Sequence, residues 1–337
     1  MDDMLKFNKK DNEVKIMTAL YIILGIAAFL LILFVILGAV GYKVALVSNR
    51  HKKPETEPIK IWRAGERKKN NAYLLSHNPE DLSLESHGEK MRAWFVPAKS
   101  ETKKFVICIH GYNCNGPDEC GHLFPFYHDE MGFNYLLPDL RGHGRSEGSK
   151  IGFGSFDHKD IKLWIDYLVE RFGEDIEIVL HGISMGAATA MLVNNTSPRE
   201  QVKLVVEDCG FTNAYDVVKN KIKTMIGFEP RIMVFFINIF CNILSGYDLK
   251  KDCNPLETMK NAKNPVMFVH GGKDPLVPFE MCGELYDACP VDKEIFTVPD
   301  AIHAFCYYDK KEQYNEKMRS FFAKHLDLAE KKRETLS

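Results

Sequence analysis

A serine flanked by glycines is the first residue in this sequence that could do chemistry. It lies in "IVLHGISMGAATAML", residues 178–192, where a strand-like apolar run ends and a helix-like run of small residues begins. A sharp strand-to-helix turn would expose the hydroxyl, and it needs small residues at Gly182 and Gly186. The G-x-S-x-G pattern also occurs in plain turns, but this context predicts a nucleophile elbow at Ser184. The backbone N–H of Met185 would then be an oxyanion donor.

A nucleophile elbow requires an acid and then a histidine later in the chain. Asp274 is the predicted acid because it follows the strand-like run of "PVMFVHGGKDPLVP", and Asp208 in "VVEDCG" is the alternative. His303 in "EIFTVPDAIHAF" is the predicted base. Among twelve histidines it alone lies between the last strand-like run and the last helical segment. Four other histidines are expected to be structural: His110, His143, His181 and His270.

The loop after the first parallel strand should supply a second oxyanion donor. In "VICIHGYNCNG", His110 and Gly111 fix the turn, and the N–H of Tyr112 is predicted to point inward. Such a set of residues carries out acyl transfer without a metal or an organic cofactor. The sequence also holds no Cys-x-x-Cys pair, no His-Glu-x-x-His and neither glycine-rich nucleotide motif, so it signals no metal or nucleotide site.

Six short apolar strands would have to position these residues. They alternate with helical segments, a pattern typical of a parallel sheet covered by helices on both faces; they are "KFVICIHG", "FNYLLPD", "IEIVLHG", "VKLVVEDCG", "PVMFVHGG" and "EIFTVPD". Residues 81–98 alternate in polarity around a His87-Gly88 turn, which predicts an antiparallel hairpin at the start. Two amphipathic helices are predicted, one over 155–172 with Ser155 as its cap and one at the C-terminal end, burying Tyr314, Met318, Phe321, Phe322 and Leu326.

Residues 213–263 are longer than a single crossover helix needs and are predicted to form a helical lid insertion. Within them, Ile232–Leu244 carries no charge over 13 residues, which is too short to cross a bilayer. This segment is either an ordinary buried helix or a lid helix whose apolar face lines an acyl pocket or touches the membrane.

An uncharged run of 27 residues, from Ile16 to Tyr42, predicts a transmembrane anchor. A cleaved signal peptide is the alternative, although its apolar core is normally about 7–15 residues long. The predicted organisation is an N-terminal tail (1–15), the anchor (16–42), a linker (43–60), an α/β domain (61–331) that contains the insertion, and a charged tail (332–337).

Charge and cysteine content bear on partners and location. The net charge of −2 gives no electrostatic reason to expect nucleic acid as a partner. Basic residues flank the apolar run almost equally, so the positive-inside rule does not decide its orientation. Nine cysteines without framework spacing suit a reducing compartment, which favours a catalytic domain on the cytoplasmic side. The sequence leaves the oligomeric state undecided.

The sequence resembles the α/β-hydrolase superfamily over nearly all of residues 60–330. The matching motifs are "HGYNCNG", "LLPDLRGHGRSEG", "LHGISMGA", "VHGGKDPLVP" and "PDAIHAF", in the family's order. With its N-terminal apolar run, the chain is similar to membrane-anchored bacterial hydrolases of the BEM46-like type. The resemblance implies Ser184 as nucleophile, Asp274 as acid, His303 as base, and Tyr112 and Met185 as oxyanion donors. One departure is that Asp300-Ala301-Ile302 stands where the family usually has a glycine-containing turn.

The expected function is that of a membrane-anchored serine hydrolase that cleaves carboxylic esters, lipid-like or acyl substrates included. An S33-type aminopeptidase, a thioesterase and an acyltransferase use the same triad and remain alternatives. A membrane-tethered binding protein on an inactive hydrolase scaffold is the alternative from another class. The aminopeptidase would need acidic groups near the site, and the insertion holds five: Asp216, Glu229, Asp248, Asp252 and Glu257.

Overall fold

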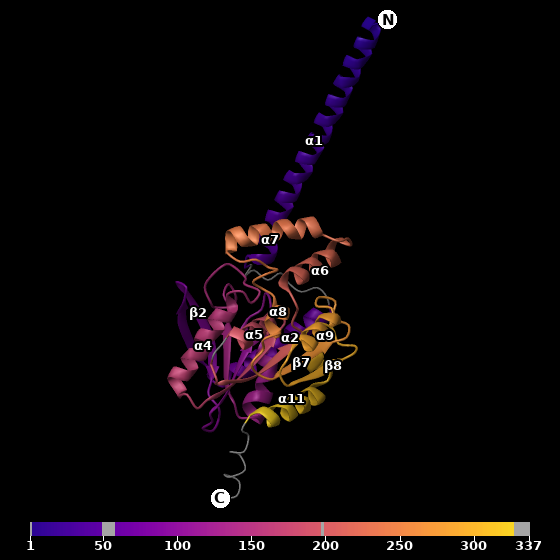
Figure 1. Cartoon of the computed structure of the whole chain (residues 1–337). Coiled ribbons are helices and arrows are strands. Elements are labelled where there is room, and N and C mark those ends of the chain that lie inside the picture. The colour runs from indigo at the N-terminus through magenta and orange to yellow at the C-terminus, as the bar shows by residue number, and fades with distance from the viewer. Residues whose placement is uncertain (1, 49–57, 197–198, 327–337) are drawn as a thin grey trace, which may run out of the picture.

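The computed structural model describes residues 2–48, 58–196 and 199–326. Figure 1 labels the elements along the chain. The strands are β1 (Glu80–Ser86), β2 (Glu89–Val96), β3 (Lys104–Ile109), β4 (Asn134–Asp139), β5 (Glu177–Ile183), β6 (Val202–Asp208), β7 (Val266–Gly271) and β8 (Lys293–Val298). The α-helices are α1 (Asp2–Leu46), α2 (Pro58–Leu75), α3 (Gly116–Cys120), α4 (Asp157–Phe172), α5 (Met185–Thr196), α6 (Ala214–Ile226), α7 (Arg231–Ser245), α8 (Pro255–Met259), α9 (Phe279–Ala288), α10 (Cys306–Asp309) and α11 (Lys311–His325).

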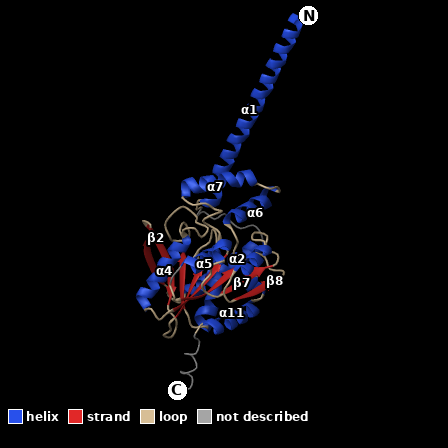
Figure 2. Ribbon diagram, in the orientation of Figure 1, coloured by secondary structure: helices blue, strands red, loops and turns tan. Residues whose placement is uncertain are grey.

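One sheet of eight strands, in the order β1-β2-β4-β3-β5-β6-β7-β8, organises the described part of the chain. The β1–β2 and β2–β4 pairs are antiparallel, and every other neighbouring pair is parallel. His87 and Gly88 take positive φ angles of 51° and 77° in the turn of the first hairpin. The predicted α/β fold with an antiparallel start is therefore confirmed (Figure 2).

Both faces of the sheet are buried, which explains its uninterrupted apolar strands. In β3, Phe105, Ile107 and Ile109 join one core cluster, whereas Val106 and Cys108 join the other. Because successive side chains of a strand point to opposite faces, each cluster is the core on one side of the sheet. Helices α4 and α5 cover the first face and α11 covers the second.

The two amphipathic helices predicted from the sequence are present, with one correction. All five apolar residues expected on the inner face of α11 are buried. Helix α4 begins at Asp157, and Ser155 is not its cap, because the N-cap position is Phe156, which makes no capping bond. The Asp157 carboxylate turns back instead and accepts the Gly154 N–H at 2.7 Å, which ties down the turn before the helix.

Helix α1 extends beyond the predicted anchor. Within its segment Val14–Leu46, the most apolar stretch of 18 residues has a mean hydropathy of 3.2, and the segment is long and apolar enough to cross a membrane. The last turns are not linker, because Tyr42 and Leu46 are buried in the domain core and Val47 pairs with Lys150. Residues 49–57 of the predicted linker lie outside the described residues, and helix α2 begins at Pro58. The predicted charged tail, 332–337, also lies outside the described residues.

The predicted insertion is helical. Helices α6, α7 and α8 lie between β6 and β7, as expected for residues 213–263. Figure 1 shows α7 lying across the C-terminal part of α1, at the point where α1 meets the domain.

Candidate active site

The strand-to-helix turn expected around Ser184 is present. Strand β5 ends at Ile183, α5 begins at Met185, and Ser184 between them has a φ of 56°, which is sterically costly for a residue with a side chain. Its N–H donates to the Asp208 carbonyl at 2.8 Å, which holds the strained residue against the neighbouring strand. The turn exposes the hydroxyl beyond the end of the sheet.

The glycines on either side of Ser184 are required by close backbone contacts. A Cβ on Gly182 would overlap the carbonyl of Gly186, the second residue of α5. A Cβ on Gly186 would overlap the carbonyl of Ile109 at the end of β3. Both clashes are with backbone atoms, which cannot move aside as a flexible side chain can. Glycine therefore lets the elbow pack tightly against β3.

Ser184, His303 and Asp274 form one hydrogen-bonded row. The serine Oγ lies 2.9 Å from His303 Nε2, and His303 Nδ1 lies 2.6 Å from Asp274 Oδ2. The other Asp274 oxygen, Oδ1, accepts the backbone N–H groups of Leu276 and Val277 at 2.8 and 2.9 Å. The carboxylate is thus fixed by its own loop and presents its Oδ2 to the imidazole of His303. This arrangement sets the tautomer in which Nε2 can accept the serine proton.

The loops that carry the acid and the base pass each other at glycines. A Cβ on Gly271 would overlap the carbonyl of Ala301, and a Cβ on Gly272 would overlap that of Pro299. The Lys273 N–H also donates to the Ala301 carbonyl at 3.0 Å. At this contact the glycines belong to the loop that carries Asp274. The loop that carries His303 therefore needs no glycine next to Ala301.

The two predicted oxyanion donors flank the elbow. Met185 opens α5, so its N–H points out of the first turn of the helix. The loop that bears Tyr112 crosses the elbow closely, because a Cβ on Gly111 would lie 3.3 Å from the Ser184 Cβ. Among the hydrogen bonds of the described residues, none uses the N–H of Tyr112 or Met185. Both N–H groups therefore remain the predicted oxyanion donors.

A buried ion pair that the sequence did not indicate supports this loop. Glu119 in α3 lies 2.5 Å from Arg63 and 3.5 Å from Arg67, both on α2. Its Oε2 would be 3.6 Å from a Cβ on Gly111, so the pair lies directly behind the oxyanion loop. Burial raises the pKa of Glu119, but the two guanidinium groups outweigh it and lower the pKa to about 2. The loop is therefore held against α2 by a carboxylate that is ionised at neutral pH.

Asp208, the alternative acid, is not brought to His303. Its Oδ2 accepts the Tyr314 hydroxyl at 2.9 Å, and that hydroxyl also lies 3.2 Å from His181. Burial raises the pKa of Asp208 to about 6. The residue that does approach the base is Cys209, whose Sγ lies 3.9 Å from His303 Nε2. Of the two candidate acids, only Asp274 contacts the imidazole.

The four histidines expected to be structural all make hydrogen bonds outside the row, although His270 Nε2 also lies 3.6 Å from Asp274 Oδ2. His110 accepts the Leu140 N–H at 2.9 Å, His143 accepts the Asn113 N–H at 3.2 Å, and His270 Nε2 lies 3.0 Å from the Val277 carbonyl. His181 lies 2.8 Å from the Tyr127 hydroxyl. Their structural role is thereby confirmed.

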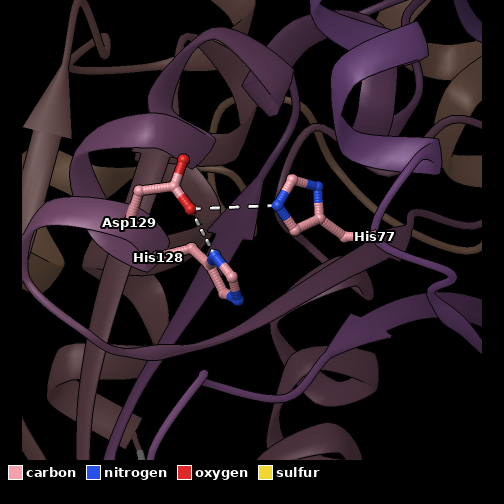
Figure 3. A group of neighbouring side chains, drawn as sticks. All are labelled: His77, His128 and Asp129. Carbon is pink, nitrogen blue, oxygen red and sulfur yellow. Dashed lines mark hydrogen bonds and ion pairs between the residues drawn. The ribbon is translucent and has the colours of Figure 1, made fainter.

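Two groups of side chains in the described residues are compact enough to hold a metal ion. One is Cys209 with Asp274 and His303, which belongs to the row above. The other, His77 with His128 and Asp129, is drawn in Figure 3. Here Asp129 already accepts the Lys99 ammonium at 2.8 Å and the Tyr73 hydroxyl at 2.6 Å. The second group therefore has the contacts of an ion-pair network that joins the end of α2 to the π-helix Pro125–Glu130.

Comparisons with known proteins agree with this architecture. The sequence model of the family described as "Serine aminopeptidase, S33" matches residues 100–224. The Bacillus subtilis protein YqkD is 22% identical over 245 residues, which cover 73% of this chain and 79% of that protein. The lysophosphatidylserine lipase ABHD12 of Rattus norvegicus is 24% identical over 59% of this chain and 48% of its own length.

Solved structures show the same fold. The Pyrococcus furiosus esterase Pf2001 aligns with a TM-score of 0.63 and 21% sequence identity, over 83% of this chain and 98% of the esterase. The chain therefore has the α/β-hydrolase fold, and over residues 100–224 it is similar to the serine aminopeptidase family.

Proposed function

We propose that this protein is a membrane-anchored serine hydrolase that cleaves carboxylic esters through an acyl-enzyme on Ser184. The observation that carries the proposal is the unbroken row from Ser184 through His303 to Asp274, with distances of 2.9 and 2.6 Å. A hydroxyl in a strained elbow, an imidazole in reach of it and a fixed carboxylate behind the imidazole are the parts that nucleophilic catalysis requires.

The chemistry proceeds in two halves. His303 Nε2 takes the Ser184 proton while Oγ attacks the ester carbonyl, and the N–H groups of Tyr112 and Met185 bind the resulting oxyanion. Collapse of the tetrahedral intermediate breaks the ester C–O bond, and the imidazolium returns its proton to the departing alcohol. Water then attacks the acyl-enzyme with His303 again as the base, and the acid is released. Asp274 holds the tautomer and stabilises the imidazolium throughout.

Ester substrates fit this chain better than peptides with a free amine. An aminopeptidase needs an unpaired carboxylate to bind the substrate ammonium group. In the insertion, Asp216 is paired with Lys219, Glu229 with Lys223 and Glu257 with Lys260. Asp248 and Asp252 accept backbone N–H groups within their own loop. The esterase and lipase names of the relatives favour the same substrate class.

We also propose that α1 is a single-pass anchor. Membrane association is supported by its length and hydropathy and by membrane proteins among the relatives, such as the Saccharomyces cerevisiae protein YNL320W. All nine cysteines are free and buried, which fits a domain in a reducing compartment. On this ground the catalytic domain is assigned to the cytoplasmic side.

The test is turnover by the full chain in detergent, with p-nitrophenyl esters of increasing chain length as substrates. The wild type is expected to hydrolyse them and Ser184→Ala to lose that activity. Folded wild-type protein that turns over no ester would instead favour the binding-scaffold alternative. Adding an amine, alcohol or thioester to the assay separates acyl transfer and thioester hydrolysis from ester hydrolysis.

A further inference from the structure

Helix α7 is apolar on the face that points away from the domain. Its inner face, formed by Val234, Ile237 and Cys241, is buried in the core. By the 3.6-residue helical period, the residues about half a turn away are all apolar as well: Ile232, Phe235, Phe236, Ile239 and Ile243. Ile232, Phe235 and Ile243 are 53%, 55% and 70% exposed. A helix in contact with water on its outer side normally carries polar residues there.

The apolar outer face of α7 lies beside the membrane-crossing helix. A Cβ on Gly38 of α1 would overlap the side chain of Phe236, and a Cβ on Gly41 would lie 2.6 Å from Ile237. Tyr42 and Ser245 join their hydroxyls at 2.9 Å. Glycine on α1 thus permits close helix packing, and Phe236 connects the outer face of α7 to the surface of α1. Figure 1 shows the two helices crossing where α1 leaves the domain.

The length of α1 fixes the level of the bilayer relative to α7. From Lys15 to Gly38, where α7 makes contact, lie about 22 uncharged residues, or about 33 Å of helix at 1.5 Å per residue. The hydrocarbon core of a bilayer is about 30 Å thick. A span that begins at the charged end of this run therefore ends at α7, and Tyr42 and Leu46 beyond it are already inside the domain.

The end of α6 extends the same surface. Met225 and Phe228, in and just after its last turn, are 72% and 65% exposed. The hairpin also carries four basic residues, Lys219, Lys221, Lys223 and Arg231, of which Lys219 and Lys223 pair with Asp216 and Glu229. Apolar side chains flanked by cationic ones are typical of helices that lie in the plane of a membrane interface.

We infer that α7 and the α6–α7 turn form a second membrane contact, lying flat in the interface of the bilayer that α1 crosses. The outer face of α7 enters the headgroup and upper acyl region of the bilayer. The domain is then attached to the membrane by two elements, α1 and α7, instead of by α1 alone. This inference rests on α1 being a membrane span and does not depend on the proposed hydrolase activity. A second copy of the chain could cover the same face, and the experiment below distinguishes the two.

The test places a fluorophore on α7. Because the nine native cysteines are buried, Phe235→Cys and Ile243→Cys can be labelled selectively with an environment-sensitive dye, and the unsubstituted chain measures the background. Gln313→Cys, exposed on α11 at the end of the domain far from α1, is the matched control (Figure 2). Each full-length variant is reconstituted as one copy per nanodisc, with nitroxide lipids labelled either near the glycerol or at the end of the acyl chain.

We expect blue-shifted emission at positions 235 and 243 that is quenched more by the shallow nitroxide than by the deep one. Position 313 should show neither effect. Emission at 235 and 243 that matches position 313 would overturn the inference. A blue shift that nitroxide lipids do not quench, and that grows with protein concentration in detergent, would also overturn it and indicate a second copy. The readout does not involve catalysis, so its failure is distinct from failure of the proposed function.

Discussion

The two compact clusters described above both pair histidine with aspartate, and one of the two has the geometry of a catalytic site. In the first, Asp274 is anchored by two backbone N–H groups, and its remaining oxygen lies 2.6 Å from His303 Nδ1 and 3.6 Å from His270 Nε2. In the second, Asp129 shares its oxygens among a lysine, a tyrosine and a histidine. Proximity of an imidazole and a carboxylate is common to both clusters. The difference is a dedicated acid and a hydroxyl held on the far side of the imidazole.

Replacing each of the two aspartates by asparagine tests this comparison most strongly. Asp274→Asn should lower kcat by about 10⁴, because an amide in this position stabilises the wrong histidine tautomer. Asp129→Asn removes the same charge from the other cluster and should leave kcat within about twofold, since it does not touch the reacting groups. Steady-state ester hydrolysis by both variants checks the pair. Equal losses in the two variants would contradict the assignment.

The oxyanion loop should give the next largest effect. Gly111→Ala introduces a Cβ that would lie 3.2 Å from the Ile183 carbonyl and 3.3 Å from Ser184 Cβ, so the loop must shift by a few tenths of an ångström. Misaligning one donor should cost about 10–100-fold in kcat with little change in KM. Gly116→Ala is the control, because its Cβ is as tightly placed, against Leu137, but away from the elbow. If both alanines reduce kcat equally, loop stability and not oxyanion binding is responsible.

Asp208 should matter much less than Asp274. Its carboxylate bonds to Tyr314 and not to His303, and Asn at this position keeps the backbone carbonyl that holds Ser184 N–H. We expect Asp208→Asn to reduce kcat by less than about tenfold, which corresponds to under about 1.4 kcal/mol of transition-state stabilisation. A loss as large as that of Asp274→Asn would make Asp208 the functional acid.

The smallest effect concerns the stability contributed by the second cluster. Burial raises the pKa of Asp129, but its hydrogen bonds to Lys99, Tyr73 and His128 outweigh it and lower the pKa to about 2. A depressed folded pKa stabilises the protein above the unfolded value of 3.8, and this stabilisation disappears as pH falls towards 2. Asp129→Asn should therefore lower the free energy of unfolding by about 0.2–1 kcal/mol at neutral pH, because the group is partly exposed. Urea unfolding of variant and wild type at neutral and acidic pH measures this; a difference that grows on acidification would contradict it.

The sequence predicted the parts of this molecule that depend on local pattern. Several features can be recognised in the sequence itself: the strand alternation, the elbow glycines and the order of serine, acid and histidine. Each is set by steric requirements over a few residues. The anchor was predicted to end at Tyr42, but Tyr42 and Leu46 are buried in the domain through contacts with segments distant in sequence, which a local pattern does not reveal. The Ser155 cap was wrong for a related reason, because Asp157 satisfies the turn instead.

Contacts between elements distant in sequence could not be predicted in this way. Nothing near Glu119 indicates that Arg63, on the helix after the anchor, would neutralise it beside the oxyanion loop. In the sequence, α7 is recognisable as an uncharged run. Such a run does not show which side of the helix is buried and which side is exposed. Contacts such as that of Gly38 with Phe236, visible only in the folded chain, relate that run to the membrane span.

The central claim is that Ser184 is the nucleophile, and active-site labelling tests it most directly. The full chain in detergent would be treated with a fluorophosphonate probe, digested and sequenced by mass spectrometry, with Asp129→Asn as a folded control. We predict one phosphonylated residue, Ser184, in the wild type and in the control, and no labelled serine in Ser184→Ala or after heat denaturation. A wild-type protein that is folded but unlabelled, or labelled at another serine, would contradict the account.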